Sequence, residues 1–238
     1  MVHIMLQKKN LNIFSLLLLT GALLITNACS SDSGKSPTID ISFNTNTSTS
    51  SLSKASNQSL ANSLTFLSGT ITLTQIQFEV ENDEGDSVEV NIEQVVDVDF
   101  ATGSTSPDLS SLELPVGTFV ESRVELELLD ENNNPSVVIE GTFEDSNSQT
   151  HPIRFEFNSG ETFEVEREGT VTFDSGMNVI AEVTFDPIVW FAGVSTNMLE
   201  EATKNNEGVI VISETSNIDI FDIVADGLDL ATEIEIQM

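Results

Sequence analysis

The chain has 238 residues and a formal net charge of −31, from 39 acidic and 8 basic residues, and it contains one cysteine and two histidines. A chain this acidic repels nucleic-acid phosphates and anionic lipid surfaces, so we exclude nucleic acid as a partner. A single cysteine excludes an internal disulfide and a cysteine-rich metal site. Two histidines leave few residues for most acid–base and metal-hydrolase chemistries.

The first 28 residues have the organisation of an export signal. Lys8 and Lys9 precede a mostly apolar run at positions 13–25, which is followed by Ala28 and by the only cysteine, Cys29. The run is shorter than the roughly 20 apolar residues that a membrane-spanning helix needs. A charged, then apolar, then small-residue order is typical of a cleaved signal peptide. We therefore predict a signal peptide at residues 1–28.

Positions 26–29, Thr-Asn-Ala-Cys, resemble the lipobox of bacterial lipoproteins. The resemblance implies that Cys29 is the lipidated first residue of the mature protein, and two or more acyl chains give stable attachment to a membrane. Ser30 follows the cysteine, and no Asp stands there to indicate retention in the inner membrane. By analogy we expect an outer-membrane lipoprotein that is periplasmic or surface-exposed. The alternative is an ordinary signal peptide with an unrelated cysteine.

Residues 29–62 are predicted to be the lipidated cysteine and a flexible tether. Positions 30–62 hold 11 Ser, 4 Thr and 4 Asn. Such a composition buries too little apolar surface to offset the entropy lost on ordering. The alternative for part of this stretch is a strand, because Ile39, Ile41 and Phe43 alternate with polar residues.

The rest of the chain, residues 63–238, is dominated by alternation of apolar and polar side chains. The clearest sets are Val88, Val90 and Ile92; Val120, Val124, Leu126 and Leu128; Ile153, Phe155 and Phe157; and Val179, Ala181, Val183 and Phe185. Alternation of this kind is typical of strands with one buried and one solvated face. Turn signals such as those at 82–85 and 132–135 separate the strands. These features predict a mainly β fold, an antiparallel β-sandwich in one domain, with a β-bulge between Leu73 and Ile76 where the alternation shifts by one.

The pattern changes after position 187. Asn197 followed by Glu200 resembles a capping box and predicts a short helix at residues 198–204. Residues 209–212 are expected to form a buried strand. Ile218, Phe221, Ala225 and Leu228 recur at helical spacing, which predicts a second helix. Residues 232–237 alternate again, so the fold is expected to carry one or two short helices near the C-terminus, followed by a strand.

The segment Leu-Pro-Val-Gly-Thr-Phe at positions 114–119, followed by Arg123, resembles a motif of one family of bacterial lipoproteins of unknown function. That family carries Leu-Pro-x-Gly-x-Tyr and then Ile-Arg-Leu after a short strand. Positions 69–100 are also similar to its opening strands. Phe119 stands where Tyr is usual and Ser122 where Ile is usual. The resemblance implies a β-sandwich on a lipid anchor and nothing catalytic.

The residues of the motif also have a structural interpretation of their own. Pro115 favours a turn, and Gly117 is expected to supply a backbone conformation that side chains resist. Arg123 is expected on the same strand face as Glu121 and Glu125, as a solvated cation among carboxylates. A role for Arg123 in binding a ligand is the alternative.

Two loops carry oxygen ligands at spacings that suit calcium. Asp130, Asn132 and Asn134 begin like a calcium-binding loop, but Pro135 stands where that loop has Gly, and Gly141 where it has its closing Glu. A looser site at Asp130, Asn132 and Asn134 or at Asp83, Glu84 and Asp86 stays open, and calcium is the only cofactor considered. The alternative is that both segments are β-turns, which favour Asn and Asp.

No motif indicates an enzyme. His151 is the only histidine after the signal peptide, and it has no nucleophile near it in the sequence. With 39 acidic residues, any one carboxylate pair for glycoside hydrolysis is uninformative. We therefore expect a lipid-anchored, non-catalytic binding or structural module of the cell envelope, whose protein or glycan partner the sequence does not identify. The alternatives are a cation-dependent carbohydrate or adhesion module and a hydrolase with a carboxylate pair.

Overall fold

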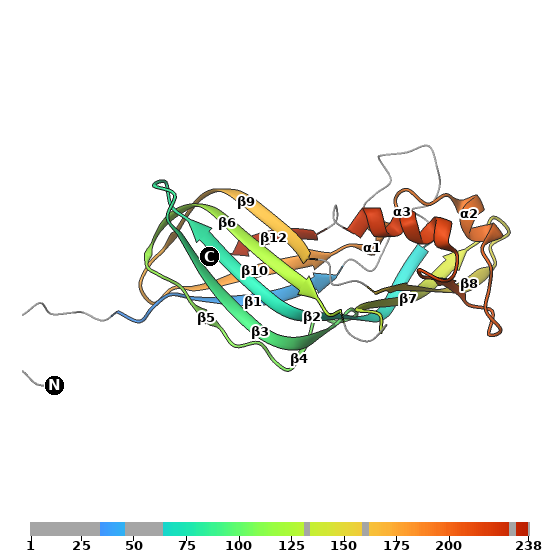
Figure 1. The fold of residues 1–238 in the computed structure, drawn as a ribbon, viewed down its shortest axis with the longest axis horizontal. Helices are drawn as coiled ribbons and strands as arrows, with labels where there is room; N and C mark the ends of the chain where they lie inside the picture. Colours follow the sequence, from blue (N-terminus) through green and yellow to red (C-terminus); the bar gives the residue numbers. More distant parts are fainter. Residues whose placement is uncertain (1–33, 46–63, 131–133, 159–161, 229–231, 238) are drawn as a thin grey trace, which may run out of the picture. The chain divides into compact units, whose positions relative to one another are not determined.

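The computed structural model describes residues 34–45, 64–130, 134–158, 162–228 and 232–237. The fold is mainly β, as predicted. Two open sheets, mixed but mostly antiparallel, pack together, and three short helices lie near the C-terminus (Figure 1). No helix in the described part of the chain is long and apolar enough to cross a membrane.

The smaller sheet has four strands in the order β12-β10-β1-β5. Their bounds are β1 Thr38–Thr45, β5 Leu112–Glu113, β10 Asn178–Phe185 and β12 Thr232–Gln237. The larger sheet has eight strands, with the path β11-β8-β7-β2-β3-β4 and with β6 between β2 and β9. Their bounds are β2 Leu64–Glu81, β3 Ser87–Asp99, β4 Thr105–Ser106, β6 Gly117–Leu128, β7 Val137–Glu144, β8 Thr150–Phe157, β9 Thr162–Phe173 and β11 Ile210–Ile212.

Part of the stretch that we expected to be a tether is a strand. β1 pairs in parallel with β10 along its whole length and antiparallel with β5 at two positions. Ile39, Ile41 and Phe43 are buried, and their polar neighbours face the other side. The alternation of these three residues therefore reports a strand inside the sandwich, and the tether interpretation is wrong for residues 38–45.

One edge of β2 is shared by two consecutive strands. Residues 73–81 of β2 pair with β6 and residues 64–71 pair with β7, both antiparallel, so β6 and β7 run in the same direction end to end. β6 ends and β7 begins opposite Thr72 of β2. The Thr72 carbonyl accepts from Leu129 N, just after β6, and the Thr72 N–H donates to the Ser136 carbonyl, just before β7. Asp130 and Asn134, the described ends of the predicted calcium segment, thus lie between the end of β6 and the start of β7.

Three register shifts interrupt the strand pairing in the described part of the larger sheet, one of them between Phe66 and Ser68 where β2 pairs with β7. The predicted shift between Leu73 and Ile76 is confirmed by the change of register between Leu73 and Gln75. A second shift between Phe119 and Glu121 was not predicted. It leaves Phe119 buried and turns Val120 outward, with 38% of Val120 exposed. The expected grouping of Val120 with Val124 on one face is therefore wrong.

The core is continuous from the sandwich to the helices. Phe163 of β9 contacts Phe185 of β10 across the two sheets, with ring centroids 6.3 Å apart. In the other half, α1 (Pro187–Trp190), α2 (Thr196–Glu201) and α3 (Ile218–Leu228) lie beside β7 and β8. Phe221 of α3 stacks on Phe155 of β8. Trp190 and Phe191 are buried.

The C-terminal elements match the predicted pattern in kind but not in every boundary. α3, β11 and β12 cover the predicted segments, whereas α2 begins at Thr196 and ends at Glu201. Its cap is Ser195, whose hydroxyl accepts from Met198 N, and not Asn197. Glu200 does not complete a capping box, since its carboxylate accepts from Ser146 N at 2.7 Å. α1 was not predicted; Asp186 caps it by accepting from Ile188 N.

Candidate functional site

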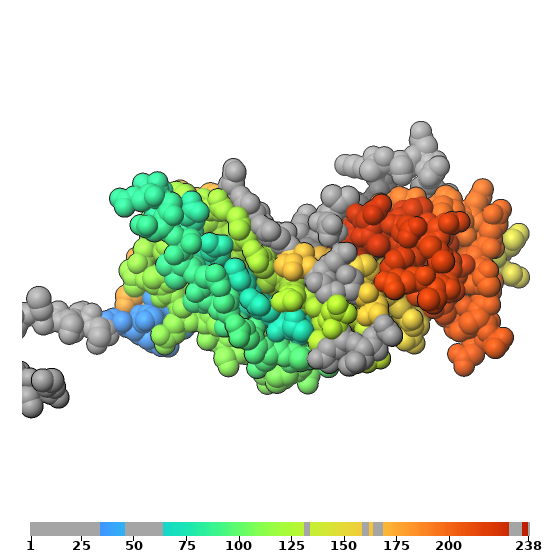
Figure 2. Space-filling model, viewed as in Figure 1, coloured from blue at the N-terminus to red at the C-terminus, as the bar shows by residue number. Residues whose placement is uncertain are grey.

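The solvent face of β2, β3 and β6 carries a dense group of carboxylates, which we call the acidic face. The name is restricted to Glu79, Glu81, Glu89, Glu93, Glu121, Glu125 and Glu127; Asp97 and Asp99 lie farther along the same side of β3. They alternate with buried residues such as Phe78 and Val124, which fixes them on the outer side of the sheet. Figure 2 shows β2, β3 and β6 open to solvent.

The register of the sheet places like charges directly beside each other on the acidic face. Glu79 lies opposite Glu89, and Glu81 lies opposite Glu121. Directly opposed like charges destabilise a sheet, by up to about 1 kcal/mol a pair. Arg123 partly offsets this repulsion, because its guanidinium lies 3.3 Å from the Glu121 carboxylate and 3.6 Å from that of Glu79. Arg123 is therefore bound within the acidic face, as the preferred sequence interpretation had it.

A small hollow lies in the acidic face. It measures about 70 Å³ and is lined by Gln75, Gln77, Glu125, Glu127 and Thr162. Gln75 Nε2 donates to Gln77 Oε1 across it. A hollow of this size has room for an ion or a few water molecules and is well below the volume of sites for drug-sized ligands.

The first predicted calcium segment, at Asp83, Glu84 and Asp86, is the turn between β2 and β3. The Asn82 side chain closes this turn, since its Oδ1 accepts from Glu84 N and Asp86 N, each at 2.9 Å. Gly85 has φ +84°. Asp83 and Glu84 point to solvent. The turn interpretation accounts for this geometry without a cation.

The second predicted segment leads from β6 toward β7. Asp130 and Asn134 are exposed, and Asn132 lies outside the described residues. In the part of the chain that the structure describes, no group of three His, Cys, Asp or Glu residues is placed to hold a metal ion. Cys29, the predicted lipidation site, also lies outside the described residues. Calcium binding and lipidation therefore stay predictions.

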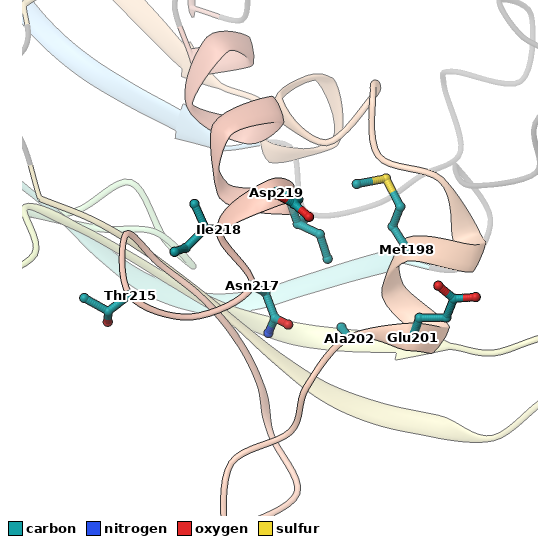
Figure 3. Close-up of a pocket in the computed structure, with 8 residues that line it drawn as sticks. Met198, Glu201, Ala202, Thr215, Asn217, Ile218 and Asp219 are labelled. Atoms are coloured by element: carbon teal, nitrogen blue, oxygen red, sulfur yellow. The ribbon is translucent and has the colours of Figure 1, made fainter.

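A larger pocket lies between the end of α2 and the start of α3. It measures about 480 Å³, and Figure 3 shows Met198 and Glu201 projecting from α2 and Asp219 from the first turn of α3. Volumes of this order are typical of small-molecule sites. Nothing in the sequence pattern singled out this pocket, because the segments that form it are joined through β11.

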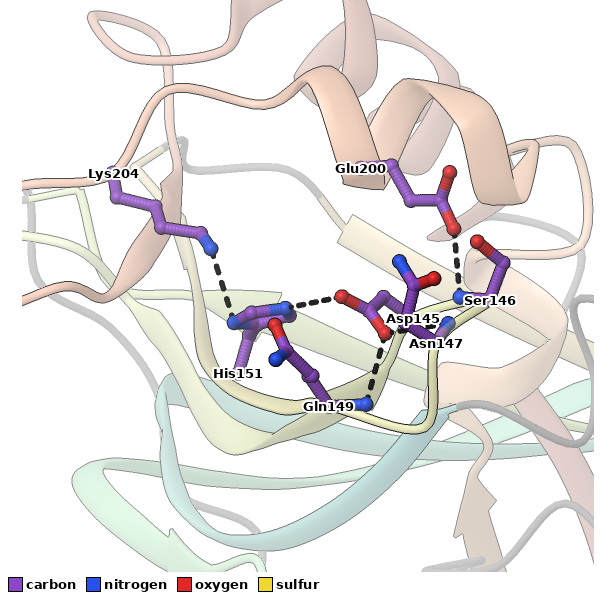
Figure 4. Close-up of polar contacts among 7 residues, drawn as sticks. All are labelled: Asp145, Ser146, Asn147, Gln149, His151, Glu200 and Lys204. Carbon is purple, nitrogen blue, oxygen red and sulfur yellow. Dashed lines mark hydrogen bonds and ion pairs between the residues drawn. The ribbon is translucent and has the colours of Figure 1, made fainter.

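His151 lies in a polar cluster that the sequence did not reveal (Figure 4). Its Nε2 is 3.0 Å from the Asp145 carboxylate, and its Nδ1 is 3.0 Å from Lys204 Nζ. Since Lys204 can only donate, Nδ1 accepts from it, and the Nε2–H group donates a hydrogen bond to the Asp145 carboxylate. The contact with Asp145 stays within the β7–β8 hairpin, and the contact with Lys204 joins that hairpin to the segment after α2. This arrangement is that of a structural contact, with no free nitrogen to act as a base.

Asp145 is the centre of the same hairpin turn. Its Oδ1 accepts from Asn147 N and Gln149 N, each at 2.8 Å. The hydrogen bond from His151, followed by that from Gln149 N, lowers the pKa of Asp145 below its ordinary value. A shifted carboxyl can mark a catalytic site, but the causes here are the bonds that close the turn. The only sequence signal was an Asp at the start of a turn and a His six residues later.

Comparisons of the chain with protein-family models, with curated proteins and with solved structures find no match.

Proposed function

We propose that this protein is a lipid-anchored, non-catalytic binding module of the bacterial cell envelope, which presents the acidic face to a basic protein partner. The observation that carries the proposal is the register of β2, β3 and β6. It places seven carboxylates on one side of the sheet, three of them within 3.9 Å of Arg123, and sets Glu79 opposite Glu89. Folding alone gains nothing from opposed carboxylates, whereas a cationic surface docked on them would relieve their repulsion.

The charge of the acidic face also decides the class of partner. Anionic glycans and phosphates are repelled by it, and a partner rich in Lys and Arg is attracted over a distance set by the ionic strength. The face follows strands rather than flexible loops, so its carboxylates are held at fixed spacing before a partner arrives. The lipid anchor proposed at Cys29 would keep the face at a membrane surface, where it meets partners in two dimensions.

The proposal is tested with an octalysine peptide and the detergent-solubilised full chain. A face variant replaces Glu81, Glu89, Glu93 and Glu127 by Gln. It keeps Glu79, Glu121 and Glu125, the partners of Arg123. The matched control removes the same charge from Glu207, Glu214, Asp222 and Asp226, which are exposed and lie in the C-terminal segment.

Fluorescence anisotropy at low salt should show that the face variant binds octalysine about tenfold more weakly, from four losses of roughly 0.3–0.5 kcal/mol each. The control should stay within about twofold of the wild type. Equal losses in the two variants would mean that net charge alone attracts the peptide, and the acidic face would then have no role.

The lipid anchor is tested by a separate variant. The Cys29→Ser protein should be released from the membrane fraction, and its persistence there after a carbonate wash would contradict lipidation.

A further inference from the structure

The pocket between α2 and α3 combines an apolar lining with two carboxylates. Its apolar residues are Met198, Ala202, Ile218 and Ile220, and its acidic residues are Glu201 and Asp219. Half of the Ile218 surface is exposed, so this side chain is accessible to a ligand in the pocket. Such a lining suits a ligand with an aliphatic part and a polar end.

The walls of this pocket are held in place by Asn217. Its side chain accepts from Thr203 N at 2.8 Å and donates to the carbonyls of Thr203 and Val211 at 3.0 and 2.7 Å. Asn217 itself has φ +53°, in the left-handed region that Asn tolerates better than most residues. These bonds tie the start of α3 to the segment that follows α2. The pocket is therefore formed before a ligand enters, which lowers the entropy lost on binding.

The carboxylates of the pocket have no compensating charge in the described part of the chain. Neither Glu201 nor Asp219 forms an ion pair or a side-chain hydrogen bond there. Asp219 lies in the first turn of α3, where the positive end of the helix dipole favours an acidic residue. Glu201 lies in the last turn of α2, where the negative end of the dipole favours a basic residue, and α2 has no basic residue there. The partial charges of the two helix ends facing the pocket have opposite signs and roughly cancel. Two full negative charges remain, so the pocket attracts a cation.

We propose that the α2–α3 pocket binds an alkylammonium group, with the aliphatic chain on Met198, Ile218 and Ile220 and the ammonium on Glu201 and Asp219. Two sources share this chemistry: a free alkylamine, and the side chain of a lysine in a polypeptide. The binding site lies apart from the acidic face and does not depend on the function proposed for that face.

The test follows the methyl resonance of Met198 by NMR in the full chain, labelled at methionine. Met177, in the turn before β10, serves as the internal reference for folding. The probes are n-hexylammonium, the neutral n-hexanol and the short methylammonium. We expect the Met198 resonance to shift with saturation by n-hexylammonium, at a dissociation constant on the order of millimolar for so small a ligand. The other two probes should bind at least about threefold more weakly, because each lacks one of the two interactions.

A double variant, Glu201→Gln with Asp219→Asn, should weaken n-hexylammonium about fivefold or more and leave n-hexanol unchanged, from two exposed charge pairs. The matched control, Glu207→Gln with Asp222→Asn, removes the same charge outside the pocket and should stay within twofold. Equal binding of n-hexanol and n-hexylammonium, or equal losses in the two variants, would overturn the proposal. N-acetyl-lysine methylamide separates the sources: binding as tight as that of n-hexylammonium assigns a lysine side chain, and weaker binding assigns a free amine.

Discussion

Asp145 shows how one side chain can organise a hairpin and join it to a distant segment. One of its oxygens closes the β7–β8 turn on the N–H groups of Asn147 and Gln149, and the other holds His151. His151 in turn accepts from Lys204, which lies 53 residues later in the chain. Asp145 thus supports, through His151, the contact between the β7–β8 hairpin and the segment after α2.

The lowered pKa of Asp145 predicts a pH dependence of stability. Because the folded state binds the proton on Asp145 more weakly than the unfolded state, its stabilising effect is present above the ordinary value of 3.8 and is lost as the pH falls below it. Asp145→Asn should therefore lower the urea midpoint at pH 6, and the difference from the wild type should shrink toward pH 3. Asp226→Asn, at an exposed position of α3, is the control for loss of one charge. A difference that stays constant from pH 6 to pH 3 would contradict the assignment.

The glycines of this fold differ in whether a positive φ, a close contact or both would oppose a side chain at their position. The expectation that Gly117 supplies a backbone conformation that side chains resist is wrong, because Gly117 has no positive φ; a Cβ there would meet only the Phe119 ring, at 3.1 Å. Gly85 and Gly103 have φ +84° and +69°. A Cβ on Gly103 would lie 2.0 Å from the Phe43 carbonyl oxygen, whereas one on Gly85 would meet nothing within 4 Å.

These two positive-φ glycines therefore make a matched pair for mutation. Gly85→Ala should cost about 1–2 kcal/mol, the strain of a left-handed conformation alone. Gly103→Ala carries the same strain and also pushes β1 away from the β3–β4 connection, which adds about 1–3 kcal/mol. Denaturant midpoints of the two variants measure the difference. Equal losses would mean that β1 is not packed against that connection.

Among the elements, β1 is an integral strand of the sandwich. Ile39 is fully buried, and its strand pairs with β10 over eight positions. Ile39→Ala should lower the free energy of unfolding by about 2–4 kcal/mol, the cost of removing a buried side chain that leaves a cavity. Asn44→Ala, an exposed change in the same strand, should stay within about 0.5 kcal/mol. A flexible tether would show no effect of either change in chemical denaturation.

The same strand shows how far the sequence could predict this fold. A period of two tells which side chains of a strand are buried, so Ile153 to Phe157, Val179 to Phe185 and the β-class were predicted correctly. It does not tell which strand lies alongside. β1 and β10 are about 140 residues apart, and their parallel pairing depends on the global arrangement. The α2–α3 pocket and the His151 cluster were missed for the same reason, since Lys204 and Asn217 act on residues brought to them by the fold.

At the scale of the whole molecule, charge opposes folding. Residues 63–238 hold 37 of the 39 acidic residues and four of the eight basic ones. Arg123 and Arg154 are each surrounded by carboxylates, at distances from 2.6 to 3.9 Å. Four basic residues cannot neutralise 37 acidic ones, so the folded state concentrates repulsion that an expanded chain relieves. Added salt should stabilise the fold, because the Debye length falls to about 10 Å at 0.1 M.

The last prediction separates this screening from a specific calcium site at Asp83 or Asp130. Sodium, magnesium and calcium chlorides at matched ionic strength should raise the melting temperature to within about 1 °C of one another, since Asn82 already closes the Asp83 turn. A calcium site at tenfold its dissociation constant would add about 1.4 kcal/mol, which corresponds to roughly 3–6 °C for a chain of this size. If calcium raised the melting temperature by that much more than magnesium does, screening alone would not explain the effect of the salts on stability. Asp83→Ala and Asp130→Ala would then show which loop binds the ion, because only the change at the true site would abolish the excess.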